Sequence, residues 1–238
     1  MCGRFRLARR KEILEENFGA ECALDDAEWT PRYNVAPGQA IAVIREERVR
    51  QDGAGPLRRL EQLRWGLIPW WAKEPATGYK MINARAETAA ERPAFRDALR
   101  ARRCLIPADG FYEWKREDKQ KLPFCFTIAG DPVAGDTLFA FAGLWERWRN
   151  PQGQAVESCA ILTSAANELV RDVHDRMPVI LAPEAYELWL DPGFHKVEEL
   201  LPWLRPYPAE AMRRYRVGER VNQVNNDDAQ CAAEIGAV

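Results

Sequence analysis

The sequence has few of the features that would indicate a metal site, a secreted protein or a membrane protein. Its six cysteines are scattered and form no CxxC pair, so neither a zinc site nor a dithiol redox motif is indicated. No apolar run approaches the ~20 residues that cross a bilayer, and the basic residues near the start lead into no signal-peptide segment. We therefore expect free thiols in a reducing cytoplasm.

Neither positively nor negatively charged residues are in large excess. The 34 Lys and Arg residues nearly balance the 36 Asp and Glu residues, which gives a formal net charge of −2. A general positive field of the kind that draws proteins to nucleic acids is therefore not expected. A local basic groove stays open as an alternative.

The first part of the chain mixes helices with strands. Helical periodicity over 9–18 stops at Gly19, and the apolar run 40–44 predicts a strand. The polar residues after that run predict an exposed hairpin loop around Asp52-Gly53. A further helix is predicted over 88–101.

Short β runs dominate the rest of the chain. Aromatic or β-branched residues mark strands at 103–107, 110–114, 122–128, 137–145 and 158–163. Helical segments return at 165–172, 183–190 and 196–204. Because strands and helices mix without strict βαβ alternation, we predict an α+β fold with a largely antiparallel sheet. No long linker divides the chain, so one domain is expected over 2–230, with 231–238 as a C-terminal tail.

Cysteine directly after the initiator methionine is an unusual placement with a chemical consequence. Removal of Met1 would leave Cys2 with a free α-amine two carbons from its thiol. An aldehyde can form an imine with that amine, and the sulfur can then close a five-membered thiazolidine ring. The pKa values of the two groups, about 7.7–8.0 and about 8.5, leave a reactive fraction of each near neutrality. The alternative is a small residue tolerated in a frayed terminus.

Two further residues are candidates for acid–base catalysis. His174, one of only two histidines, lies between Asp172 and Asp175, where an imidazole can stay partly protonated. Glu113 lies among aromatic residues in the run 110–114, and in a cleft desolvation would raise the pKa of its carboxyl. The alternatives are a surface histidine satisfied by its neighbours and a glutamate at an exposed strand edge.

Asn83, Arg85 and Glu87 alternate with alanines. In an extended conformation the three polar side chains share one face, which suits recognition of phosphate or of hydrogen-bonding groups. The alternative is a solvent-facing strand with an internal Arg85–Glu87 ion pair. Asparagine is poorly suited to strands unless its amide is used, which favours a functional role for Asn83.

A pair of tryptophans follows a proline in a predicted loop. Exposed neighbouring indoles such as Trp70 and Trp71 are typical of stacking surfaces, although most tryptophans bury their rings. Arg4, Lys73 and Arg85 are candidates for a local basic groove beside them.

Together, several motifs resemble those of the SOS response-associated peptidase (SRAP) family, whose members are abasic-site processing proteins. The motifs are C-G-R at 2–4, Y-N-V-A-P-G at 33–38, W-G-L-I-P-W-W-A at 65–72, I-N-A-R-A-E-T at 82–88, C-L-I-P-A-D-G-F-Y-E-W at 104–114, A-G-L-W at 142–145 and H-D-R-M-P at 174–178. They occur in the family's order, and the resemblance extends to about Asn225, so it covers nearly the whole chain.

The resemblance implies a curved, barrel-like antiparallel sheet with peripheral helices. It also implies capture of the ring-opened abasic sugar in single-stranded DNA as a covalent, reversible thiazolidine crosslink that shields the lesion. Carried over by motif, Cys2 is the nucleophile, and Glu113 shuttles protons during ring opening, ring closure and reversal. His174 protonates the departing hydroxyl or stabilises the imine, and Asn83 orients the amine or the sugar.

Contacts to DNA follow from the same resemblance. Arg4 and Arg85 would grip phosphates, while Trp70, Trp71 and the turn at Pro37 would stack on or wedge against the flanking bases. No metal or organic cofactor is needed. The expected partner is single-stranded DNA with an abasic site, and replication or repair proteins are further candidates. A monomer without membrane attachment is expected in the cytoplasm, associated with the nucleoid when bound to DNA.

Two other classes of function stay open. A thiol peptidase that mainly removes its own Met1 would use Cys2 and His174 as nucleophile and base. A non-covalent single-strand-binding module would need no cysteine at position 2. The crosslinking hypothesis requires that Cys2 lie close to Glu113, His174 and Asn83, with its sulfur accessible to a carbonyl group.

Overall fold

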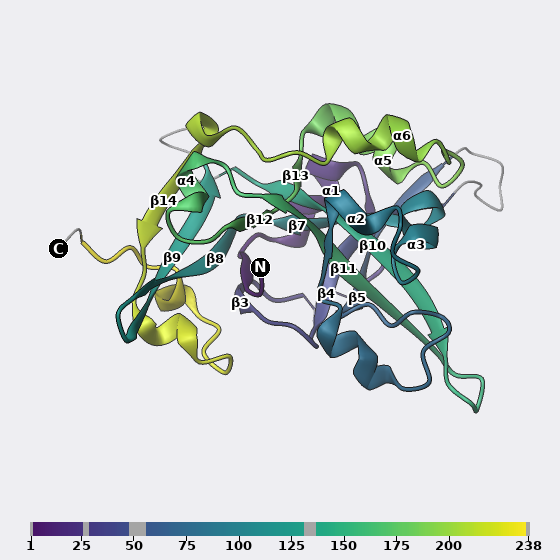
Figure 1. The fold of residues 1–238 in the computed structure, drawn as a ribbon, viewed down its shortest axis with the longest axis horizontal. Coiled ribbons are helices and arrows are strands. Elements are labelled where there is room, and N and C mark those ends of the chain that lie inside the picture. Colours follow the sequence, from purple (N-terminus) through teal and green to yellow (C-terminus); the bar gives the residue numbers. More distant parts are fainter. Residues whose placement is uncertain (1, 26–28, 48–55, 131–136, 237–238) are drawn as a thin grey trace.

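Two β-sheets meet in the middle of the molecule, and the N-terminal end of the chain lies between them (Figure 1). The structure is a computed structural model that describes residues 2–25, 29–47, 56–130 and 137–236. The smaller sheet has five strands, in the order β14 (Met212–Arg216), β9 (Gln120–Ile128), β8 (Gly110–Glu117), β1 (Phe5–Leu7) and β3 (Arg32–Val35).

The larger sheet closes into a barrel. Its strand order is β12 (Arg176–Pro178), β11 (Ala155–Ala165), β10 (Phe139–Arg149), β7 (Arg103–Ala108), β4 (Ala40–Glu47), β5 (Leu57–Trp65) and β2 (Glu21–Cys22). β11 also pairs with β5, in parallel, with Cys159 opposite Trp65, so the five strands β11, β10, β7, β4 and β5 form a ring. The barrel-like α+β fold that the resemblance implied is thereby confirmed.

Two short strands extend this sheet. β13 (Ile180–Leu181) pairs with β10, and β6 (Asn83–Arg85) pairs in parallel with β11. Most pairings are antiparallel, as predicted, and the parallel ones involve β2, β5, β6 and β11. The expected loop around Asp52-Gly53 lies outside the described residues, but the strands on either side of it, β4 and β5, pair antiparallel.

Short helices cover the outside of the sheets, and several lie together along one edge of the barrel (Figure 1). They are α1 (Lys11–Phe18), α2 (Ala86–Ala89), α3 (Arg96–Ala101), α4 (Glu168–Arg171), α5 (Tyr186–Leu190) and α6 (Val197–Leu200). Short 3₁₀ helices span Pro75–Lys80, Pro183–Ala185, Leu201–Trp203, Ala209–Ala211, Glu219–Asn222 and Ala229–Cys231. Within the described part of the chain, no helix has the length and apolarity needed to cross a bilayer.

Local sequence explains where two of these helical segments end. α1 stops at Gly19, which adopts the left-handed conformation at φ 59° that glycine tolerates best. The single helix predicted over 88–101 is wrong, because two short helices, α2 and α3, flank Pro93. Proline disfavours helical geometry at the residue before it, which is consistent with this interruption.

Residues near the C-terminus pack on the smaller sheet. Cys231 is fully buried, and the backbone N–H of Ile235 donates to the carbonyl of Arg216 at the end of β14. Val217 and Glu234 form an antiparallel bridge. The packing thus continues past residue 230, where the sequence-based division ended the domain.

Candidate active site

Backbone pairing with β8 fixes the position of the N-terminal residues. Phe5 lies opposite Phe111, and the N–H of Tyr112 donates to the carbonyl of Arg4 at 2.9 Å. Continuing this antiparallel register backward along the chain brings the residues before Arg4 alongside Glu113. The pairing therefore carries Cys2 toward the glutamate that the sequence singled out.

Cys2 itself is buried at the junction of the two sheets. Its side chain has no exposed surface, and its sulfur lies 4.0 Å from the carbonyl oxygen of Arg4. Burial raises the pKa of the Cys2 thiol well above its usual range, and the negative charge of Glu113 raises it further. In this form, which carries Met1, the thiol stays protonated at neutral pH. The expectation of a sulfur accessible to a carbonyl group is not met in it.

Asn83 reaches Cys2 from the barrel. β6 lies beside β11 with Asn83 opposite Ile161, and the Asn83 Nδ2 donates a 2.8 Å hydrogen bond to the carbonyl oxygen of Cys2. The Asn83 Oδ1 is buried and accepts no hydrogen bond from the described residues. Because an unsatisfied buried oxygen costs free energy, this atom is a ready acceptor for a ligand.

Glu113 has the properties of a proton-transfer group. It is only 4% exposed on β8, so the alternative of an exposed strand-edge residue is wrong. Burial raises the pKa of the Glu113 carboxyl to about 7, and the negative charge of Asp175 contributes to the rise. Near neutrality the group is therefore present in both protonation states.

His174 lies between α4 and β12. Its Nδ1 is 3.0 Å from the backbone N–H of Arg176 and 3.0 Å from a carboxylate oxygen of Asp175. The first contact needs a lone pair on Nδ1, and the second needs a proton there. Burial lowers the pKa of His174, which favours the neutral ring that accepts from Arg176.

The sequence-based view of the aspartates around His174 needs correction. Asp172 does not hold the imidazole in its charged form, because it pairs with Lys115 at 3.3 Å and with Arg214 at 2.9 Å. Asp175 does contact the ring but does not raise its pKa above the ordinary value. These ion pairs instead fasten the segment before His174 to β8 and β14.

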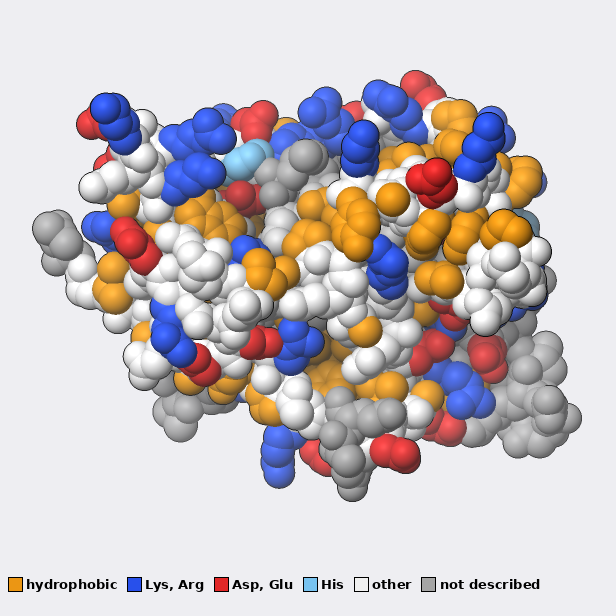
Figure 2. All heavy atoms as spheres, turned by 90° about the horizontal axis from the view of Figure 1, so that it is seen from below, with side chains coloured by type: hydrophobic (Ala, Val, Ile, Leu, Met, Phe, Trp, Pro, Cys, Tyr) orange, Lys and Arg blue, Asp and Glu red, His pale blue; other side chains and the backbone are white. Residues whose placement is uncertain are grey.

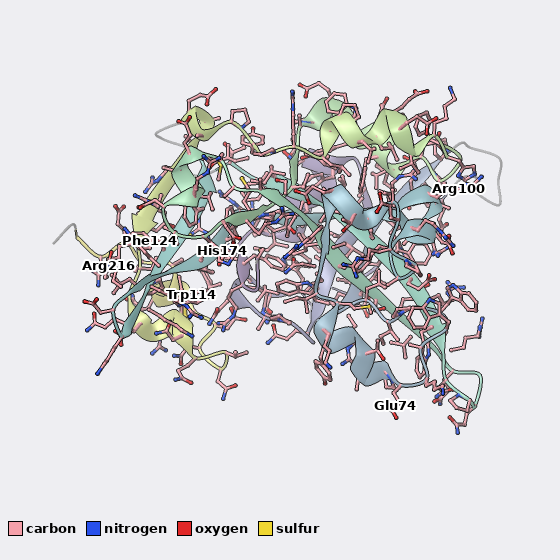
Figure 3. The ribbon with its side chains drawn as sticks, viewed as in Figure 1. Glu74, Arg100, Trp114, Phe124, His174 and Arg216 are labelled. Carbon is pink, nitrogen blue, oxygen red and sulfur yellow. The ribbon has the colours of Figure 1, made fainter. Side chains whose placement is uncertain are left out.

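An open cleft connects Glu113 and His174 to solvent. It is lined by Arg4, Glu113, Trp114, Arg116, Lys121, His174 and Asn222. Figure 3 shows Trp114 and His174 on the same side of the molecule, and Figure 2 shows basic side chains gathered beside a histidine on this face. Although the chain as a whole is slightly acidic, three of the seven residues that line the cleft are Arg or Lys and one is acidic.

Arg4 is part of the cleft wall. Its Nη1 donates to the Asn34 side chain and to the carbonyl of Val221, both at 2.7 Å, and its guanidinium lies 5.6 Å from the centre of the Trp114 ring. Trp114 in turn donates from Nε1 to the Asn222 side chain at 2.7 Å. Arg4 is thus held by protein groups while it remains partly open to the cleft.

Asn222 brings the segment 221–227 into the wall of the cleft. The buried Asn34 on β3 holds this segment, since its Nδ2 donates to three of its backbone carbonyls, those of Val221, Gln223 and Asn226. Asp227 accepts hydrogen bonds from the backbone N–H groups of Tyr33 and Asn34. The cleft is therefore built from both ends of the chain.

A second surface carries exposed aromatic side chains. Trp70 and Trp71 are 61% and 47% exposed, so the alternative that both are core residues is wrong. Tyr79, which the sequence analysis did not single out, is 63% exposed and lies under the Arg64 guanidinium, 4.9 Å from the ring centre. A side-chain carbon at Gly38 would lie 3.3 Å from its ring, which places the turn at Pro37 beside Tyr79.

Glu87 does not share a face with Asn83 and Arg85 as predicted. The strand ends at Arg85 and α2 begins at the next residue, so Glu87 belongs to a helix. Glu87 binds Arg176 through two hydrogen bonds of 2.7 and 2.8 Å instead of pairing with Arg85. Arg85 is left exposed at the end of β6.

Sequence reasoning also missed residues that line the cleft itself. Arg116 and Lys121 flank the turn of the β8–β9 hairpin, and the segment around Asn222 is far away in the chain. The sequence shows a cation on each side of the turn E-D-K-Q, so these two residues could have been found. The position of residues 221–227 beside the cleft could not be predicted from the sequence. Among the described residues, no group of His, Cys, Asp and Glu is arranged to hold a metal ion.

Comparison with known proteins gives consistent results. Residues 1–224 match the family described as SOS response associated peptidase (SRAP). The abasic site processing protein YoqW of Bacillus subtilis (strain 168) is 46% identical over 231 residues, which cover 97% of this chain and 98% of that protein. The abasic site processing protein YedK of Escherichia coli (strain K12) is 34% identical over 200 residues, covering 80% of this chain and 79% of that one.

Solved structures share the fold. A crystal structure of a Bordetella bronchiseptica protein has a TM-score of 0.74 at 30% identity, covering 91% of this chain and 100% of that one. A Bacteroides thetaiotaomicron protein reaches a TM-score of 0.83 at 24% identity, over 98% of this chain and all of that one. The second likeness concerns the fold alone.

Proposed function

This chain belongs to the SOS response associated peptidase family of abasic site processing proteins, and on that premise we propose that it captures abasic sites covalently in single-stranded DNA. The proposed product is a thiazolidine between Cys2 and the ring-opened sugar, which shields the lesion. The observation that carries the proposal is the convergence of Asn83 and Glu113 on Cys2 from two different sheets.

The proposed reaction proceeds in two bond-forming stages. After Met1 is removed, the α-amine of Cys2 adds to the aldehyde carbon of the sugar, and the resulting carbinolamine loses water to give an imine. The Cys2 sulfur then adds to the imine carbon while its proton passes to the nitrogen. One water is released in total, and no oxidant or reductant takes part.

Glu113 is the proposed proton carrier for both stages. With a pKa of about 7, its protonated form can donate to the departing hydroxyl and its ionised form can accept the thiol proton. A base is needed because the thiolate is the nucleophile, and the negative charge of Glu113 raises the pKa of the Cys2 thiol. The same group, acting in reverse, would allow the ring to reopen.

His174 and Asn83 have supporting roles in this proposal. The neutral His174 ring, which accepts from Arg176 through Nδ1, presents its Nε2–H as a hydrogen-bond donor for the sugar hydroxyl. Asn83 fixes the backbone of Cys2 through Nδ2 and can accept a hydrogen bond from the substrate or the amine through Oδ1. Arg4 and Arg85 are the proposed phosphate contacts, and Trp70, Trp71 and the Pro37 turn are the proposed contacts to flanking bases.

The burial of Cys2 imposes a condition on this mechanism. Loss of Met1 must open the site, because the aldehyde has to reach both the nitrogen and the sulfur of Cys2. Processing of the first residue would therefore both free the amine and uncover the thiol.

Intact mass after incubation with abasic single-stranded DNA tests the proposal. The expected species is the protein without Met1 plus the strand minus one water, and it should survive denaturation. Cys2→Ser should lose this species while keeping its affinity for a strand with a tetrahydrofuran site, which has no aldehyde. An adduct of equal yield in Cys2→Ser would overturn the mechanism.

The family description also supports a second candidate, a peptidase. In that case Cys2 and a neighbouring base would hydrolyse the Met1–Cys2 bond, with water consumed and free methionine released. Synthesis of the chain in a mixture without methionine aminopeptidase would separate the two sources of processing. Removal of Met1 there, and its failure in Cys2→Ala and in His174→Ala, is the result expected of self-processing.

A further inference from the structure

The β8–β9 hairpin places two cations directly opposite each other at the mouth of the cleft. Arg116 on β8 is the register partner of Lys121 on β9, so their side chains project from the same face of the sheet. Both residues are exposed, and both line the cleft that contains Glu113 and His174. The described residues contain no carboxylate in an ion pair with either of them.

Such a pair has a cost in the free protein. Like charges directly opposite each other in an antiparallel pair destabilise the sheet. The neighbouring residue Lys115, whose side chain belongs to the other face, is neutralised by Glu117 and Asp172. The hairpin thus balances the charge of Lys115 on one face and leaves Arg116 and Lys121 without a carboxylate ion-pair partner among the described residues on the other.

We infer that Arg116 and Lys121 bind the sugar–phosphate backbone of the DNA strand on one side of the lesion. This inference rests on the proposed function, which brings an abasic strand to Cys2. A phosphate placed between the two side chains would neutralise both and relieve their mutual repulsion. Arg4, on the same cleft wall, continues the basic surface from the hairpin toward Cys2.

The contact would guide the strand without reading its sequence. Phosphate contacts position a nucleic acid, whereas sequence is read at the bases. The exposed aromatic residues Trp70, Trp71 and Tyr79 come from other loops, after β5 and before β6, and not from this hairpin. In this arrangement the DNA backbone on one side of the lesion makes an electrostatic contact with the hairpin. Bases stack on the separate surface formed by the aromatic residues.

A matched pair of substitutions tests this inference. Lys121→Gln and Lys119→Gln each remove one positive charge from the same hairpin, but Lys119 lies in the turn and does not line the cleft. Affinity for a single strand with a tetrahydrofuran site is measured by fluorescence anisotropy across a salt series. The logarithm of the association constant falls linearly with the logarithm of the salt concentration, and Lys121→Gln is expected to reduce the magnitude of that slope by about 0.7. The double variant, Arg116→Gln with Lys121→Gln, is expected to reduce it by about 1.4.

At 0.1 M salt the double variant is then expected to bind about 25-fold more weakly, if its affinity equals that of the wild type near 1 M salt. Lys119→Gln should match the wild type in slope. Because the substitutions relieve repulsion, neither Lys121→Gln nor the double variant should unfold at a lower urea concentration than the wild type. Equal slopes for Lys121→Gln and Lys119→Gln would overturn the inference.

The position of the contact is tested with two single-stranded DNA oligonucleotides, one with the reactive abasic site near its 5′ end and one with the site near its 3′ end. The double variant should crosslink more slowly with the strand whose nucleotides reach the hairpin and at the wild-type rate with the other. Equal slowing with both strands would contradict a contact on one flank. Failure of the wild type to form an adduct with either strand would refute the proposed function instead, and the tetrahydrofuran measurement would still decide the role of the hairpin.

Discussion

The side-chain amide of Asn83 donates a 2.8 Å hydrogen bond to the backbone carbonyl of Cys2. Asn83 belongs to β6, which pairs with the barrel strand β11, whereas Cys2 precedes β1 of the smaller sheet. One hydrogen bond thus joins the two sheets at the candidate nucleophile. This bond holds the backbone of Cys2 in a fixed position relative to both sheets.

Replacement of Asn83 should slow crosslinking without weakening DNA binding. Asn83→Asp keeps the shape but puts a carboxylate oxygen against the Cys2 carbonyl, so we expect at least a 10-fold slower rate of adduct formation. Asn83→Ala removes a hydrogen bond with a net value of about 1 kcal/mol, which corresponds to about 5-fold. The rate is followed by denaturing gel, with affinity for the tetrahydrofuran strand as the control. An unchanged rate in Asn83→Asp would show that this contact has no positioning role.

Glu113 should make stability depend on pH in a defined direction. Its pKa is raised from 4.5 to about 7 on folding, so the folded state binds the proton more tightly than the unfolded state. This stabilisation is complete below about pH 4.5 and is lost as the pH rises through about 7. Relative to Glu113→Gln, the wild type should therefore lose on the order of 3 kcal/mol across that interval.

Urea unfolding of both proteins at pH 4.5 and pH 8 measures this difference. The exposed Glu117→Gln variant is the control, because it removes a carboxylate from the same strand without removing a buried one. If the difference in unfolding free energy between the wild type and Glu113→Gln were the same at both pH values, the pKa of Glu113 would not be raised in the folded protein.

Loss of Met1 should change the reactivity of the Cys2 thiol. In the chain that carries Met1, burial and a raised pKa make Cys2 inert toward iodoacetamide. Cys22 is the one cysteine that is only partly buried, so the experiment is done in a Cys22→Ser background. Protein without Met1 should gain one label by mass at neutral pH, and protein with one alanine inserted between Met1 and Cys2 should gain none. Equal labelling of the two would argue against uncovering of the site.

Trp70 and Trp71 should contribute to DNA binding and little to folding. Stacking of a base on an aromatic side chain is worth about 1–3 kcal/mol, so Trp70→Ala and Trp71→Ala should each weaken single-strand binding by about 5-fold or more. Both rings are largely exposed, and the midpoint of thermal unfolding should move little. Trp65→Ala, which removes a fully buried indole, is the contrasting variant and should destabilise the protein strongly. Retained affinity in both exposed variants would remove them from the binding surface.

The sequence was a good guide to the elements and a poorer one to their long-range pairing. The runs at 103–107, 110–114 and 122–128 lie in strands because aromatic and β-branched residues suit a pleated, half-buried surface. Closure of the barrel through β11 and β5 depends on a pairing between distant segments, which local patterns do not encode. The same limitation concealed the contribution of Asn222 to the cleft wall.

Electrostatic details were harder to predict than residue identities. Cys2 and Asn83 do come together, but Asp172 pairs with Lys115 and Arg214 instead of His174, and the Glu87 carboxylate binds Arg176. Which neighbour a charged side chain meets depends on three-dimensional placement, not on spacing in the chain. The Arg116–Lys121 pair is the clearest example, since it follows from hairpin register alone once the register is known.

The cleft wall held by Asn34 has a consequence for protein synthesis. Arg4 and Asn34 leave the ribosome long before Val221 and Asn222, yet they depend on those late residues for their hydrogen bonds and for one side of the cleft. A nascent chain therefore presents its second residue to the cell before the surroundings that direct its chemistry exist. Those surroundings are complete only after Val221 and Asn222 have also left the ribosome.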